Sequence, residues 1–309
     1  MCLKQVVDIM ELLDDASING EKVKHFFSSF GIDNIEVIPL TGSKGGTDFI
    51  KILLPGKNGK TNGGDAPTIG ILGRLGGVGA RPEVIGIVSD ADGAIVALAS
   101  ALKIGTASAK GDVFEGDVIV TTQISPSAPI LPHKPVPFMT SAVDLVEVLR
   151  HEVDPSMDAI LSIDATKGNR IIKVQGFAIT PTVKNGWILK VSDDLVNIYE
   201  RVTGDVVHVV PITMQDITPY GNNVYHINSI MQPWLMTNAP VVGVATTAKA
   251  VIPGCGTGAN YVLDLEQATR FCIEVAKEFT SGNCKFYDEN EYKILLERYG
   301  DIGSMLRKF

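Results

Sequence analysis

The sequence predicts a single α/β domain, 1–309, in which helices pack on both faces of a mixed β-sheet. Three observations favour this fold class. Short apolar runs of strand length alternate with segments of helical periodicity. The central runs are apolar at almost every position, as is typical of strands covered on both faces. A chain of 309 residues is also within reach of one hydrophobic core, which would bury about 75% of the extended-chain surface.

The composition indicates a soluble globular protein. Hydrophobic residues make up 45% of the chain and charged residues 20%, and the net charge is −8 without a Lys/Arg cluster. We therefore expect no nucleic-acid partner, since phosphate contacts need a basic face. No apolar run approaches the ~20 residues that span a bilayer, so no membrane insertion is expected. Four cysteines without C-x-x-C spacing, and a start without signal-peptide character, predict a cytoplasmic protein with reduced thiols.

The first third of the chain predicts two helices and then a hairpin. Apolar residues at helical spacing predict a helix over 3–14, and a helix with an acidic first turn follows over 17–30. Strands over 36–40 and 47–54 flank a Gly-rich turn. A polar, Gly-rich loop over 55–65 leads to the central strands.

The rest of the chain alternates strands with helices and ends in a helical tail. Apolar runs predict the strands, and helical spacing predicts the helices. The expected strands are 68–72, 84–88, 117–122, 157–164, two within 170–189, 206–212 and 241–245. The expected helices are 93–102, 141–151, 193–203, 264–279 and the tail at 284–309.

Polar residues follow the predicted strands at the points where the strands end. Ligands of open α/β sheets bind beyond the carboxyl ends of the strands, so these residues are the candidates for a functional site. They are Arg74, Asp90, Asp92, Thr121, Thr122, Gln123, Asp164, Lys167 and Asn169, then Asp216, Tyr220, Asn222, Asn223 and His226 from a loop, and Cys255 and Thr257 from a Gly-rich turn.

Each candidate also has an ordinary structural explanation. Asp90 could cap the helix that begins near Gly93, and Asp164 could belong to a turn that ends its strand. Cys255 is more often a small buried apolar residue than a nucleophile, and His226 could be a hydrogen-bonded core histidine. The convergence of many polar side chains at successive strand ends favours the functional interpretation.

The order of elements resembles that of the zinc aminopeptidases that form large hollow oligomers. Four segments carry this resemblance. The opening of that family is similar to MELLDDASINGEKVKHFFSSFG, which begins at Met10, and its first core strand is similar to APTIGILG at 66–73. Its metal-bearing strand is similar to DAILSIDAT at 158–166, and its last strand is similar to APVVGV at 239–244. The resemblance implies a three-layer α/β/α architecture of the zinc-exopeptidase (phosphorylase/hydrolase-like) type, and a homo-oligomer. The segment between Arg74 and Asp90 is too short for the large insertion of that family.

The same resemblance implies a degenerate metal site. Arg74 begins the segment that replaces the family's His-x-Asp, and residues 121–125 lack its Glu-Glu pair. Asp90 matches the bridging carboxylate, Asp164 matches the later Asp ligand, and Cys255 lies in the region of the terminal His. Two carboxylates are too few for a co-catalytic zinc pair, and a guanidinium repels a cation.

Two further motifs, GRLGGVGARP at 73–82 and QDITPYGN at 215–222, resemble a widespread prokaryotic family of unknown function. That family implies no activity, so the sequence leaves three functions open.

The first is a small-molecule-binding protein or non-peptidase enzyme for an amino-acid-like or carboxylate-like compound. Arg74 would bind a carboxylate and the pair Asp90 and Asp164 an amine, which makes these three the candidate catalytic residues. The second is a metal-dependent hydrolase, of peptidase or amidohydrolase type, with Asp90 and Asp164 as ligands of zinc or manganese and with His226 and Cys255 as further candidate ligands; a protein without metal is the favoured expectation. The third is an oligomeric scaffold. Further ligand contacts are expected from Asp92, Thr122, Lys167, Asn169, Asp216, Asn222, His226 and Cys255.

Overall fold

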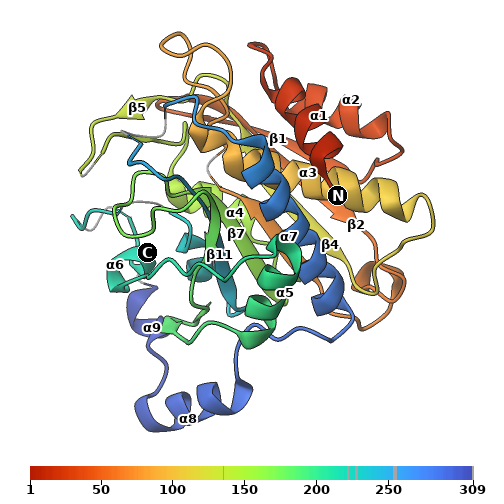
Figure 1. Cartoon of the computed structure of the whole chain (residues 1–309), viewed down its shortest axis with the longest axis vertical. Helices are drawn as coiled ribbons and strands as arrows, with labels where there is room; N and C mark the ends of the chain where they lie inside the picture. Colours follow the sequence, from red (N-terminus) through yellow and green to blue (C-terminus); the bar gives the residue numbers. More distant parts are fainter. Residues whose placement is uncertain (75, 135, 221–222, 227–228, 253–255, 308–309) are drawn as a thin grey trace.

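The computed structural model describes residues 1–74, 76–134, 136–220, 223–226, 229–252 and 256–307 (Figure 1). Within these residues the central feature is a nine-stranded sheet. Its order is β1 (Ile35–Gly42), β2 (Gly45–Leu54), β4 (Val118–Ile124), β3 (Ile69–Gly73), β7 (Ala159–Ala165), β11 (Val241–Thr247), β9 (Val183–Lys184) and β10 (Trp187–Ile188), with β8 (Gly176–Ile179) also paired to β11.

The sheet is mixed, as predicted. The four central strands β4, β3, β7 and β11 run parallel to one another. The hairpin of β1 and β2 joins β4 in antiparallel orientation, and β8 and β9 join β11 in the same way. The carboxyl ends of the four central strands therefore lie at one edge of the sheet.

One face of the sheet packs against α3 (Asp92–Ser108) and α7 (Val262–Thr280), and α1 (Leu3–Leu13) packs on these two helices. Alternate strand residues such as Ile71, Val120 and Leu161 join these helices in one hydrophobic cluster. Helix α3 is buried along most of its length and approaches the strand ends closely at Gly93, where a Cβ atom would lie 2.6 Å from the carbonyl oxygen of Ile163. A side chain at Gly93 would push the start of α3 away from the sheet.

The other face carries α4 (Leu145–Glu152), α6 (Met214–Ile217) and the short helix η3 (Gln232–Met236). Leu72, Ile119 and Ile160, which alternate with the residues of the first face, belong to a second hydrophobic cluster together with Trp234. The indole of Trp234 is fully buried and donates to the carbonyl oxygen of Ile217 at 2.8 Å. This bond ties η3 to α6.

The remaining elements lie at the periphery. They are α2 (Gly20–Ser28), η1 (Lys60–Asn62), β5 (Ile130–Leu131), β6 (Phe138–Met139), α5 (Asp193–Thr203), α8 (Glu289–Tyr299) and α9 (Gly303–Leu306). The short helix η2 (Ser89–Ala91), in contrast, is buried and leads into α3. Helix α8, in the tail, contains no buried residue and stands away from the rest of the chain in Figure 1. In the described part of the chain, no helix has the length and apolar character needed to cross a membrane.

Two predicted strands are wrong. Residues 84–88 form turns and bends with one isolated bridge, from Gly79 to Ile87, and residues 206–212 contribute only the bridge from Ile179 to Val209. The apolar character of 84–88 reflects a small separate cluster in which Val88 packs with Met139, whereas Ile85 is 95% exposed. Periodicity alone did not distinguish such a loop from a buried strand.

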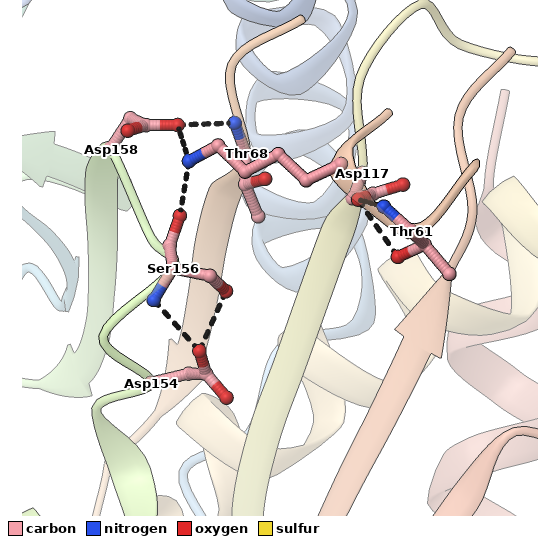
Figure 2. Close-up of polar contacts among 7 residues, drawn as sticks. Thr61, Thr68, Asp117, Asp154, Ser156 and Asp158 are labelled. Carbon is pink, nitrogen blue, oxygen red and sulfur yellow. Dashed lines mark hydrogen bonds and ion pairs between the residues drawn. The ribbon is translucent and has the colours of Figure 1, made fainter. Parts of the chain in front are cut away.

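The amino ends of the central strands are held by carboxylates that accept hydrogen bonds (Figure 2). Asp117, just before β4, accepts from the backbone and hydroxyl of Thr61 at 2.8 and 2.9 Å. Asp158, just before β7, accepts from the backbone of Thr68 at 2.7 Å and from the ammonium of Lys60 at 2.6 Å. These contacts fix the loops at this end of the sheet, opposite to the edge where the candidate residues lie.

Candidate functional site

Three side chains project from neighbouring parallel strands toward the face covered by α4 and η3. The register pairs Leu72 of β3 with Thr121 of β4 and with Ser162 of β7. Two residues further along the chain come Gln123, Arg74 and Asp164. Since side chains alternate along a strand, these three continue the face of Leu72. The N–H of Arg74 donates to the carbonyl oxygen of Ile163 at 2.9 Å, which extends the parallel pairing to Arg74 itself.

Arg74 is fully buried and forms an ion pair with Glu152, which is also fully buried. Glu152 is the last residue of α4, and its backbone carbonyl accepts from the hydroxyl of Thr121 at 3.0 Å. Burial lowers the pKa of Arg74 to about 10, although the nearby Asp164 opposes this shift. The carboxylate that faces this guanidinium is thus supplied by the protein itself.

Asp164 lies beside Arg74, near the end of β7. One carboxylate oxygen accepts from the backbone N–H of Ala165 at 2.8 Å, and the other accepts from the hydroxyl of Ser229 at 3.2 Å. Burial raises the pKa of Asp164 to about 6, and the guanidinium of Arg74 and these hydrogen bonds limit the rise. Asp164 therefore changes its charge close to neutral pH.

Asp90, like Glu152, has a buried carboxylate oxygen without a hydrogen-bond partner among the described residues, but unlike Glu152 it forms no ion pair there. It lies in η2, just before α3, and is only 6% exposed. Its Oδ2 atom has no hydrogen-bond partner among the described residues. Burial raises the pKa of Asp90 well above the ordinary range, and the charges of Asp164 and Asp92 add to this shift, whereas Lys167 opposes it.

Asp92 and Lys167 form a buried ion pair. The ammonium of Lys167 lies 2.5 Å from Oδ2 of Asp92, which also accepts from the hydroxyl of Thr246 at 2.7 Å. The other oxygen of Asp92 accepts from the amide of Asn260 at 2.6 Å. These contacts join the start of α3 to β11 and to the loops after β7 and β11.

These residues form one buried charge cluster, which consists of Arg74, Asp90, Asp92, Glu152, Asp164 and Lys167. Four carboxyl groups and two cations give a formal excess of two negative charges when all six groups are ionised. Such an excess is costly in a low-dielectric interior, and for Asp90 the charges of Asp164 and Asp92 add to the rise in pKa that burial causes. The cluster therefore favours the approach of a positive charge.

Three predicted ligand contacts have hydrogen bonds within the fold. The hydroxyl of Thr122, on the α3 side of the sheet, donates to the carbonyl oxygen of Gly73 at 2.9 Å. The side-chain oxygen of Asn169 accepts from the N–H groups of Ile171 and Ile172 at 2.9 and 2.8 Å, as in a turn. Asp216 caps α6. Contact between these residues and a ligand stays a prediction.

The loop after α6 brings aromatic groups toward the charge cluster. The rings of Tyr220 and His226 lie 4.3 Å apart, and burial and the charge of Asp164 raise the pKa of Tyr220. Nε2 of His226 donates to the carbonyl oxygen of Thr218 at 3.2 Å, whereas its buried Nδ1 has no partner among the described residues. Burial lowers the pKa of His226. Asn222 and Cys255, which were also predicted to contact a ligand, lie outside the described residues.

Among the described residues there is no group of three or more His, Cys, Asp or Glu side chains that could hold a metal ion. Asp90 and Asp164 are two carboxylates, and the guanidinium of Arg74 beside Asp164 opposes a cation at that position.

A family model described as "Protein of unknown function (DUF1177)" matches residues 39–308. The chain belongs to this family. Its membership confirms the resemblance to a family without an assigned activity that the sequence motifs indicated. A search of curated proteins found no match.

Among solved structures, this DUF1177 family member is similar to the LapA aminopeptidase of Legionella pneumophila. One LapA structure has 11% sequence identity and a TM-score of 0.46, with 93% of this chain and 71% of the other covered. A second LapA structure has 12% identity and a TM-score of 0.45, with 90% and 72% covered.

Glu152 is the site residue that sequence reasoning missed. A signal for it exists in the sequence, because Leu145, Val148, Leu149 and Glu152 follow the i, i+3, i+4, i+7 spacing of one helix face. A carboxylate on an apolar helix face needs a buried cation as its partner. Arg74, at the end of a buried strand, is that cation.

Proposed function

We propose that this chain binds a small amine-bearing molecule, such as an amino-acid-like compound, at the carboxyl ends of β3 and β7. Asp90 and Asp164 receive the ammonium group. The observation that carries this proposal is the buried Oδ2 atom of Asp90, which has no partner among the described residues although it belongs to a cluster with excess negative charge. A buried carboxylate without a partner is costly, and a ligand ammonium supplies the missing partner.

The pairing of Arg74 favours an amine over a carboxylate as the group that is recognised. Glu152 already lies against the guanidinium, and Asp164 is close to it as well. A ligand carboxylate would add a further negative charge to a cluster that already has too many. Asp90 and Asp164 are 6% and 3% exposed, so a ligand that reaches both is small.

The proposal includes the loss of the co-catalytic zinc pair, in accordance with the poor fit of the described residues to such a site. A single divalent cation is the other positive species that two carboxylates attract. It would correspond to the alternative of a metal-dependent hydrolase. The expected homo-oligomer and the cytoplasmic location stay predictions.

Three matched compounds test the proposal. Alanine carries both an amine and a carboxylate, ethylamine lacks the carboxylate, and propionate lacks the amine. Titrations followed by protein NMR should show binding of alanine and ethylamine but not of propionate. Asp90→Asn should abolish binding, because it removes the charge without changing the shape. Asp112→Asn, a change of the same kind at an exposed position, should have no effect.

Two results would contradict this function. Binding of propionate as tight as that of ethylamine would show that the charge of Asp90 does not select the ligand. Stoichiometric zinc or manganese in the purified protein, lost on Asp164→Asn, would favour the hydrolase alternative.

A further inference from the structure

Gln123 has a buried hydrogen-bond donor that the fold leaves unused. The residue lies near the end of β4 and is 1% exposed. Its side-chain oxygen accepts from the hydroxyl of Ser141 at 3.2 Å, whereas its amide Nε2 has no hydrogen-bond partner among the described residues. Buried amide groups are normally satisfied, so an exception of this kind points to a partner from outside the chain.

The orientation of this carboxamide is set by its neighbour. The hydroxyl of Ser141 accepts from the backbone N–H of Val143 at 3.3 Å, and its proton is therefore free to point to the oxygen of Gln123. This arrangement leaves the NH₂ group of Gln123, a donor, as the unpaired part of the side chain.

The unused donor lies near the unused acceptor of Asp90. Gln123 is on the same sheet face as Arg74 and Asp164, one strand away from Arg74, and adjacent strands are about 4.8 Å apart. Two successive glycines lie against the two side chains: a Cβ on Gly76 would lie 2.7 Å from Cγ of Gln123, and a Cβ on Gly77 would lie 3.2 Å from Oδ2 of Asp90. Gly76 has a φ of +46°, which also favours glycine.

We infer that Gln123 is a second anchor for the ligand and donates a hydrogen bond to its carbonyl oxygen, while Asp90 and Asp164 hold its ammonium. The inference rests on the proposed function and narrows it to compounds that carry both an amine and a carbonyl group. A neutral carboxamide adds no charge to the cluster, so it recognises an uncharged carbonyl as well as a carboxylate. Two anchors of opposite polarity also fix the direction in which the ligand lies.

Matched pairs that differ only in a carboxamide test this inference. They are glycinamide with methylamine, β-alaninamide with ethylamine, and 4-aminobutanamide with propylamine. In NMR titrations of the full-length protein, at least one amide should bind about tenfold more tightly than its parent amine, as expected for one hydrogen bond to a buried donor. The pair with the largest difference measures the separation between the two anchors.

Gln123→Leu should remove this preference, so that each amide binds no more tightly than its parent amine. Gln123→Met, which keeps the length of the side chain without its polar atoms, serves as a second variant if the first does not fold. An amide preference that persists in both variants overturns the inference. If the amines bind the wild type but no amide is preferred, the inference fails and the proposed function stands. If no amine binds at all, both fail together.

Discussion

Asp90 and Asp92 are two residues apart, yet the two carboxylates differ in their hydrogen-bond partners. Asp92 has three polar partners, one of which is the ammonium of Lys167, whereas Asp90 keeps an unpartnered oxygen. Asp92 therefore contributes to the fold, while Asp90 is maintained at a cost to stability. Costs of this kind are common at functional sites.

Neutralising Asp90 should stabilise the protein at neutral and alkaline pH. The raised pKa means that the folded state binds a proton more tightly than the unfolded chain, so stability decreases as the pH rises above the ordinary aspartate range. Asp90→Asn removes this pH-dependent loss of folding stability, because asparagine does not ionise. Thermal unfolding at pH 8 should show a higher midpoint by a few degrees, and the difference should vanish near pH 4. A lower midpoint at pH 8 would argue against an unpaired charge.

The affinity for an amine should depend on pH through Asp164. Its pKa of about 6 means that the carboxylate is mostly protonated at pH 5 and mostly ionised at pH 7. Because an ammonium group prefers the ionised form, the affinity for ethylamine should increase over this range. Titrations at pH 5, 6, 7 and 8 measure this effect, and a constant affinity from pH 5 to 8 would contradict it.

Glu152 should be required for stability as the partner of Arg74. Glu152→Gln leaves the guanidinium buried beside Asp164 without its main counter-ion, and we expect a loss of roughly 3–5 kcal/mol in the free energy of unfolding. The double variant Arg74→Met and Glu152→Met should recover most of this loss, because it removes both charges. Urea denaturation measures both changes. A double variant that is less stable than Glu152→Gln would contradict the assignment of Glu152 as the counter-ion of Arg74.

At the scale of elements, the start of α3 determines the position of Asp90. The helix can approach the ends of β3 and β7 because its second residue, Gly93, has no side chain. Helix α4 makes the corresponding contribution on the other face, where its last residue reaches Arg74. The charge cluster thus depends on the ends of two helices on opposite faces of the sheet.

Gly93→Ala should weaken the binding of amines. The new methyl group would lie within 2.6 Å of the carbonyl oxygen of Ile163, so the start of α3 and Asp90 with it would have to move. Gly105→Ala in the same helix is the matched control, because its methyl group would meet the flexible side chain of Ile32, which is far along the helix from Asp90. The affinity for ethylamine should fall in the first variant only. Equal affinities for ethylamine in the two variants would show that the position of α3 does not affect the binding of amines.

At the scale of the whole molecule, the parallel strands separate two kinds of polar residue. Asp117 and Asp158 hold loops at the amino ends, and the charge cluster lies at the carboxyl ends. This division follows from topology, because parallel strands place all their carboxyl ends on one edge. The sequence therefore predicted that Arg74 and Asp164 belong to the same edge of the sheet.

Local signals explain which elements could be predicted. The helix expected over 193–203 has these bounds in the structure, because Ser192 caps its start and Gly204 adopts the left-handed conformation after its end. The run 84–88 has no such signals, and of its apolar residues Val88 is buried whereas Ile85 is exposed. The ion pair between Arg74 and Glu152 depends on how α4 crosses the sheet, and a single sequence does not record that geometry.

The titration of the Asp90 carboxyl group, followed by carbon-13 NMR with Asp90→Asn to assign the signal, tests the central claim most directly. We predict a pKa well above the ordinary aspartate value in the free protein, and a lower pKa when an amine is bound, because the ammonium stabilises the ionised form. An ordinary pKa near 3.8 that does not change on addition of amines would contradict the account.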